Sequence, residues 1–207
     1  SIDALGATPR PEGRDVASRG LAWLASRQGP DGAFGSSGAK GLYGHAIATL
    51  AFARAYPLLG EAIYKHHASR GAAFLQRAQQ RDQGWGYAGS DTSVTAWAAA
   101  ALAAAASSEV EVAVDPGALD GALRWLDAAT DDRAYETRYR RRSDGRWERS
   151  EGAAAEALRI RMALGQDRAL PVVRGSARRL GWHLPYWRDE GPSGADFAAW
   201  YSGTSAL

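Results

Sequence analysis

The sequence predicts an all-α fold of about four helical hairpins. Three observations predict it: a motif recurs at a fixed period, alanine-rich segments separate its copies, and no stretch alternates as a strand would. Alanine is the strongest helix former, and these segments have no internal proline. Because one helical hairpin cannot bury its apolar stripe alone, the hairpins must stack on their neighbours.

The repeated motif consists of Arg-Gly, two further residues, an aromatic residue and Leu. It begins at Arg19 and at Arg70, keeps only Trp-Leu at 125–126, and is degraded from Arg174 onward. The Leu positions are spaced by 51 residues: Leu24, Leu75 and Leu126. This spacing sets the length of one structural unit, a pair of helices with its connections.

The first helix of each pair carries the motif. Around 16–27, Val16, Gly20, Trp23 and Leu24 recur at helical spacing and share one face. Asp115 followed by Pro116 is a favourable start for the corresponding helix of the third pair. The alanine-rich second helices are expected at 46–56, 92–106, 152–165 and 197–207.

A glutamine and an aromatic residue follow the motif in the first two copies. Gln28 and Gln79 each stand four residues after the Leu, and glycine-aromatic turns then bring Phe34 and Trp85. A glutamine amide can bond the backbone groups that a helix end leaves unpaired. These four residues are therefore predicted to be structural.

The repeats are framed and interrupted by other segments, all within one predicted domain of 1–207. Residues 1–13 are expected to be a flexible lead-in, and 29–41 a Gly/Ser-rich loop. An insertion loop at 130–150 is rich in arginine and also holds acidic residues. It could bind phosphate or an acidic partner, or its charges could pair with each other in solvent.

Composition excludes several classes of function. Hydrophobic residues at 45% and charged residues at 23% indicate a soluble globular chain, and no signal peptide is visible, which leaves the compartment open. The longest apolar run, 96–106, is too short to span a bilayer. The absence of cysteine excludes disulfides and thiolate metal sites. A net charge of only +2 makes nucleic acid an unexpected partner.

The helix that ends in Gln before a glycine-aromatic turn resembles the QW motif of the prenyltransferase and squalene-cyclase repeat family. Segments 19–34 and 70–85 look like two such motifs, and 44–50, 91–97 and 200–204 are similar to the family's inner helices. The resemblance implies an α/α toroid, in which inner helices surround a central cavity and outer helices enclose them. Four hairpins imply a small or incomplete toroid, or part of a longer protein whose other regions are possible partners.

The motifs of the family's enzymes are incomplete. The resemblance places 88–91 at the Asp-x-Asp-Asp acid motif of the cyclases, where only Asp91 remains and Ser90 replaces the proton donor. Ser93 stands at the cysteine position of the prenyltransferase zinc motif. A neutral serine is a poor zinc ligand, so neither a metal nor a cofactor is expected.

A polar constellation arises from the predicted repeats. Each inner helix is expected to follow a small residue and a polar one, which gives His45, Asp91, Glu151 and Asp196. Around one cavity, a histidine and three carboxylates could bind a ligand, hold a divalent metal or exchange protons. They could equally cap the helix N-termini.

The leading prediction is a diverged, non-catalytic toroid domain that binds an apolar small molecule or a protein segment in its cavity. One alternative is a terpenoid cyclase or prenyltransferase-type enzyme with Asp91 as its acid. Another, by analogy of fold, is a polysaccharide-active toroid, since such enzymes also use Trp and carboxylates. The residues predicted to line the cavity are Tyr43, His45, Asp91, Trp97, Glu151, Asp196, Trp200 and Tyr201.

Overall fold

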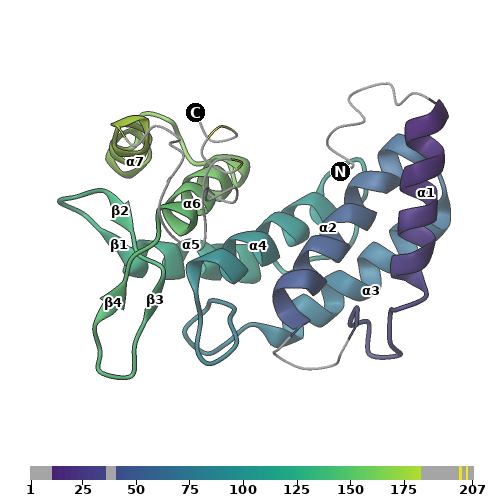
Figure 1. The fold of residues 1–207 in the computed structure, drawn as a ribbon, viewed down its shortest axis with the longest axis horizontal. Coiled ribbons are helices and arrows are strands. Elements are labelled where there is room, and N and C mark those ends of the chain that lie inside the picture. The colour runs from purple at the N-terminus through teal and green to yellow at the C-terminus, as the bar shows by residue number, and fades with distance from the viewer. Residues whose placement is uncertain (1–10, 36–40, 183–200, 202–203, 205–207) are drawn as a thin grey trace, which may run out of the picture. The chain divides into compact units, whose positions relative to one another are not determined.

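The computed structural model describes residues 11–35, 41–182, 201 and 204 (Figure 1). In this part of the chain, seven helices and four two-residue strands follow one another, which confirms the all-α prediction. The helices are α1 (Pro11–Ala25), α2 (Leu42–Leu59), α3 (Ala62–Ala78), α4 (Thr92–Ala106), α5 (Pro116–Ala129), α6 (Glu151–Ala163) and α7 (Pro171–Trp182). The strands are β1 (Thr130–Asp131), β2 (Glu136–Thr137), β3 (Arg140–Arg141) and β4 (Trp147–Glu148).

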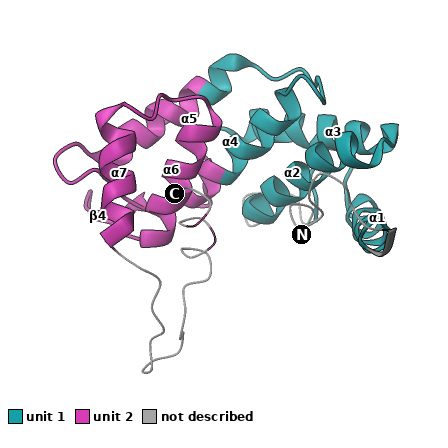
Figure 2. Cartoon of the chain, turned by 90° about the horizontal axis from the view of Figure 1, so that it is seen from above, with its two compact units in different colours: residues 1–79, 97–119 teal, residues 80–96, 120–207 magenta. Residues whose placement is uncertain are grey.

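The chain divides into two compact units, coloured separately in Figure 2. Unit 1 comprises residues 1–79 and 97–119, and unit 2 comprises 80–96 and 120–207. One boundary follows α3, and the other two fall inside α4 and α5. The predicted lead-in of 1–13 falls mostly outside the described residues, and α1 already begins at Pro11.

In unit 1, α2 and α3 run side by side as a helical hairpin (Figure 1). Small residues let the two helices approach closely: a Cβ atom built on Gly71 would overlap the Thr49 side chain. Phe52 and Leu75 are fully buried in this core. The glycine of the second Arg-Gly motif is thus a packing residue.

The predicted apolar face of the first helix is wrong in detail. Val16 and Trp23 on α1 are 60% and 59% exposed, whereas Leu21 is buried. The guanidinium of Arg27 lies 5.2 Å from the centre of the Trp23 ring. The spacing of the apolar residues correctly predicted a helix but not which of its faces is buried.

The ends of several helices follow from local chemistry. Gly60 closes α2 in the left-handed conformation at φ 79°, and its N–H donates to the Tyr56 carbonyl. Ser150 caps α6 by accepting the N–H of Ala153. Asp115 accepts the N–H of Gly117, and α5 begins at Pro116 as predicted.

The two glutamines that follow the repeat motif are structural, as predicted, and they bond neighbouring helices, which the sequence did not predict. The amide of Gln28 donates to the carbonyl of His67, and that of Gln79 donates to the carbonyl of Ala118. In both cases the acceptor lies 39 residues further along the chain. Phe34 and Trp85 are buried beneath these turns, so their structural role is confirmed.

The arginine-rich segment of unit 2 forms two small antiparallel ladders, β1 with β2 and β3 with β4. The insertion loop predicted at 130–150 gave no sign of these ladders in the sequence, because two-residue strands are too short to show alternation. Most of its arginines are neutralised within the segment. The ion pairs are Arg138–Asp131, Arg140–Glu148, Arg142–Glu148, Arg146–Asp144 and Arg149–Glu136.

The core of unit 2 includes the packing of α7 on α6. Ala154 and Leu158 of α6 meet Val173 and Leu180 of α7 in one buried cluster.

Across the described ranges, no helix combines the length and apolar character needed to cross a bilayer.

Candidate functional site

His45 lies inside an inner helix, not ahead of it as the repeat alignment predicted. Since α2 begins at Leu42, His45 is its fourth residue and is 2% exposed. Its Nδ1 accepts the backbone N–H of Phe34 at 2.9 Å, and its Nε2 donates to the Gly71 carbonyl at 3.1 Å. Burial lowers the pKa of His45 to about 4, so the ring is neutral at pH 7.

The residue equivalent to His45 in the next repeat is Thr95, not Asp91. Thr95 is the fourth residue of α4, and its hydroxyl accepts the backbone N–H of Trp85 at 2.9 Å. The aromatic residue of each turn therefore donates its N–H to the same position of the inner helix. This equivalence makes His45 part of the framework of the turn.

Asp91 stands just before α4 and caps it. Its Oδ1 accepts the Val94 N–H at 2.8 Å, and the residue is only 3% exposed. Burial raises the pKa of the Asp91 carboxyl above its usual range, and the negative charge of Glu156 raises it further. The Val94 N–H and the Arg140 guanidinium act in the opposite direction.

Glu156 was missed by sequence reasoning. It lies on α6 with 2% of its surface exposed, in the run of alanines that follows Glu151. A glutamate in an alanine-rich helix gives no signal of burial, so only the fold reveals its electrostatic coupling to Asp91. The two form an inner-helix carboxylate pair within unit 2.

Glu151 is the first residue of α6 and belongs to an ion-pair network. Both of its carboxylate oxygens accept from Arg179, at 2.8 and 2.9 Å. Arg179 also donates to Glu136 at 3.1 Å. Glu151 therefore holds α7 to α6.

The four members of the predicted polar constellation thus have different surroundings. His45 belongs to unit 1, Asp91 and Glu151 belong to unit 2, and Asp196 lies outside the described residues. Among the residues that the structure describes, no group of three or more His, Asp or Glu side chains could hold a metal ion.

Two aromatic members of the predicted cavity lie together in unit 1. Tyr43 on α2 and Trp97 on α4 meet edge to face, with ring centres 6.1 Å apart and planes at 64°. Both rings are half-buried, and Ile47, one turn after Tyr43, is 37% exposed. We name Tyr43, Ile47 and Trp97 the aromatic surface.

The two remaining predicted residues come from the C-terminal segment. Tyr201 is 45% exposed, and Trp200 lies outside the described residues. Trp200 therefore stays a prediction.

Comparison with known proteins identifies the class of fold. No family model matches the sequence. No curated protein matches it either. Among solved structures, the chain is similar to the GH76 α-mannanase BT2949 of Bacteroides thetaiotaomicron, with a TM-score of 0.56 and 13% identity over 79% of this chain. It spans about half of that protein, 51% of its length.

The likeness confirms the predicted fold class: the chain is an α/α toroid of helical hairpins. At 13% identity the likeness concerns the fold alone. The function must therefore be argued from the residues of the inner helices.

Proposed function

We propose that this chain is a non-catalytic binding domain of the α/α-toroid class, which holds a sugar ring on the aromatic surface. The observation that carries the proposal is the edge-to-face pair of Tyr43 and Trp97, half-buried on two inner helices. Rings at 64° form a corner, against which the C–H face of a pyranose can pack.

The surroundings of the polar candidates support binding over catalysis. Both ring nitrogens of His45 are engaged with the backbone, and both carboxylate oxygens of Glu151 are engaged with Arg179. These side chains serve the helix ends and the packing of helices. The aromatic surface, in contrast, meets solvent.

A carbohydrate fits this surface better than an isoprenoid does. Ile47 is 37% exposed, so a ligand seated there keeps one side in water. A sugar tolerates this because its hydroxyl groups remain hydrated, whereas an isoprenoid gains only in proportion to the apolar area that it buries and leaves its other side in water. The α-mannanase with the similar fold supports an α-linked mannose oligosaccharide as the first ligand to test.

We also propose that the chain is a diverged member of the prenyltransferase and squalene-cyclase repeat family. The support is the repeated turn, in which Gln28 and Gln79 make the same long-range bond in two copies. In that family an isoprenoid would be the expected ligand, so farnesol is the competing probe.

The test is a titration followed by tryptophan fluorescence and calorimetry, with a mannose oligosaccharide and with farnesol. Binding of the oligosaccharide should weaken at least tenfold in Trp97→Ala and in Tyr43→Ala. Trp23→Ala is the matched control, since Trp23 is exposed on an outer helix of the same unit. Equal affinity in Trp97→Ala and Trp23→Ala, or binding of farnesol alone, would contradict the proposal.

A second candidate is a hydrolase that uses the inner-helix carboxylate pair. Glycoside hydrolysis needs one carboxylic acid with a raised pKa and one carboxylate, and the raised pKa of Asp91 beside Glu156 favours this chemistry. Asp91 would protonate the leaving oxygen, and Glu156 would accept a proton from the attacking water. Protonated Asp91 would also be the acid of a terpenoid cyclase.

Incubation with mannose oligosaccharides tests the hydrolase directly. Enzymatic release of reducing sugar should vanish in Asp91→Asn and Glu156→Gln but persist in Asp144→Asn, an exposed-loop control in unit 2. Turnover that survives Asp91→Asn would exclude this candidate.

A further inference from the structure

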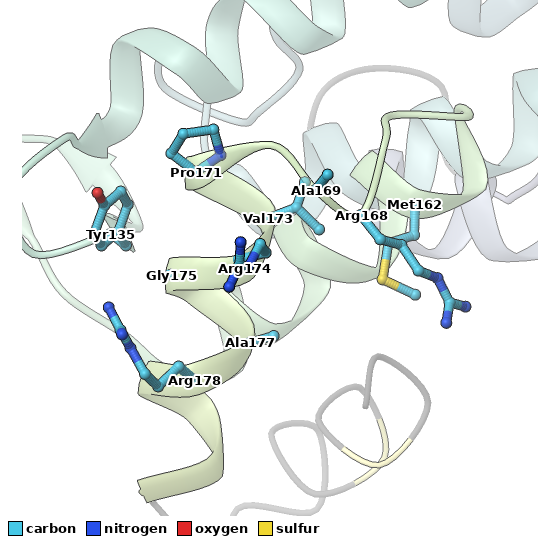
Figure 3. Close-up of a pocket in the computed structure, with 10 residues that line it drawn as sticks. All are labelled: Tyr135, Met162, Arg168, Ala169, Pro171, Val173, Arg174, Gly175, Ala177 and Arg178. Carbon is cyan, nitrogen blue, oxygen red and sulfur yellow. The ribbon is translucent and has the colours of Figure 1, made fainter.

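A groove in unit 2 was not predicted from the sequence. It has a volume of about 540 Å³ and is lined by α7, by the segment that precedes α7, by Met162 of α6 and by Tyr135 (Figure 3). Along α7, Pro171, Arg174 and Arg178 follow one another at helical spacing and share a face. The groove is formed by residues of unit 2, whereas the aromatic surface is formed by residues of unit 1.

Three features hold Tyr135 in place over α7. Its backbone adopts φ 52°, in the left-handed region that non-glycine residues seldom adopt. Its carbonyl accepts the Ser176 hydroxyl at 2.9 Å. A Cβ atom built on Gly175 would overlap the Tyr135 ring, so only glycine lets the ring lie against the helix. Unfavourable backbone conformations are found preferentially at functional sites.

Arg174 and Arg178 of this face differ from the neighbouring Arg179 in their ion pairs. Arg179 is bound to Glu151 and Glu136, but within the described part of the chain no ion pair involves Arg174 or Arg178. Both are exposed, and Figure 3 shows Arg178 reaching toward Tyr135. Most arginines of the 130–150 segment have carboxylate partners. The positive charge of Arg174 and Arg178 is therefore less neutralised by carboxylates than the positive charge of that segment.

The carboxylates near the groove have hydrogen-bond or ion-pair partners other than Arg174 and Arg178. Asp167 accepts the Ala169 N–H at 2.8 Å in the turn before α7, next to Arg168. Glu136, adjacent to Tyr135, accepts from Arg179 and pairs with Arg149. The face of Tyr135, Arg174 and Arg178 therefore favours an anionic ligand.

We propose that this groove binds a tetrahedral oxyanion, the phosphate or sulfate ester group of a ligand. Arginine forks match such oxygens with two parallel hydrogen bonds each. Residues four apart on a helix rise by about 6 Å, so two guanidinium groups can reach one anion from adjacent turns.

The test is a titration of the whole ¹⁵N-labelled chain with inorganic phosphate, inorganic sulfate and acetate, each at constant ionic strength. The Nε–Hε signals of Arg174 and Arg178 should shift and saturate with phosphate or sulfate, and not with acetate. The tighter of the two anions identifies the ester class. In the double variant Arg174→Gln/Arg178→Gln, the backbone N–H signals of Gly175 and Ala177, which also line the groove, report binding, and their saturation should require at least tenfold more anion than in the wild type.

A matched double variant controls for net charge. Arg142→Gln/Arg146→Gln also removes two positive charges from unit 2. These two arginines likewise stand four residues apart, but both are paired with Asp144. This double variant should bind as the wild type does. Equal weakening in both double variants, equal shifts with acetate, or no saturable shift with any anion would overturn the proposal.

Discussion

The first two repeats build the same turn with different side chains. Backbone bonds recur at an offset of 51 residues: Gly29 N–H to the Ala33 carbonyl, and Gln80 N–H to the Gly84 carbonyl. The N–H of the aromatic residue then meets His45 in the first repeat and Thr95 in the second. The turn thus conserves a hydrogen-bond geometry and lets the acceptor vary.

The two turns therefore share a backbone geometry but differ in the chemistry of the side chain that accepts the aromatic residue's N–H. The first turn relies on a buried imidazole, and the helix that follows has no side-chain cap on its N-terminus. The second turn relies on a hydroxyl, and Asp91 caps its helix. Polar residues near the inner-helix starts therefore serve the framework first, which leaves the aromatic surface as the stronger candidate for ligand binding.

The largest expected effect comes from removing the aromatic residue of a turn. Trp85→Ala should lower the free energy of unfolding by about 4 kcal/mol, because Trp85 is fully buried. Phe34→Ala should cost somewhat less, about 3 kcal/mol, because the ring is smaller and 6% exposed. Chemical denaturation of both variants measures the ranking, and a loss below 1 kcal/mol for Trp85→Ala would break the equivalence of the two turns.

Acid should weaken the first turn through His45, whereas the Thr95 hydroxyl that takes its place in the second turn does not titrate between pH 7 and pH 4. The pKa of His45 is about 4 when folded, below its usual value of 6.5, so the unfolded chain takes up the proton first. Stability from this residue is complete above pH 6.5 and declines as the pH falls toward 4, by about 3 kcal/mol in all.

Denaturation curves between pH 7 and pH 4 check this dependence against His45→Gln. The variant should lose the part of the slope that His45 contributes, while the contributions of His67, whose pKa burial lowers, and of Asp91, whose pKa burial raises, remain in both proteins. Thr95→Val should keep the wild-type slope. An identical slope in the wild type and His45→Gln would contradict the assignment.

The smallest effect compares the glycines of the two Arg-Gly motifs. Gly71→Ala should cost about 1–3 kcal/mol, because its Cβ would overlap Thr49. Gly20→Ala meets no atom within 4 Å and should stabilise α1 by about 0.5–1 kcal/mol through helix propensity. Thermal unfolding of the two variants gives the sign of each change in stability. A stabilising Gly71→Ala would show that the α2–α3 contact is looser than described.

Much of the fold could be predicted because its signals are local. Alanine-rich segments gave the inner helices, and Asp115 with Pro116 gave the start of α5. The period of 51 residues gave the structural roles of Gln28 and Gln79. These features depend on propensity, capping and repetition, which act over a few residues or recur along the chain.

What could not be predicted depends on contacts between distant residues. His45 was aligned with Asp91 by residue type, but hydrogen bonds across the turn pair it with Thr95. Glu156 is an ordinary helical residue until burial couples it to Asp91. The contact of Tyr135 with Gly175 joins residues 40 positions apart in the sequence. No sequence pattern around either residue predicts this contact.

The most direct measurement follows side-chain and backbone NMR signals while a mannose oligosaccharide is added to the whole chain. The account predicts that the signals of Tyr43, Ile47 and Trp97 shift together and saturate, while those of Asp91 and Glu156 stay unchanged. Shifts centred on Asp91 and Glu156, or no saturable shift in either set, would contradict it.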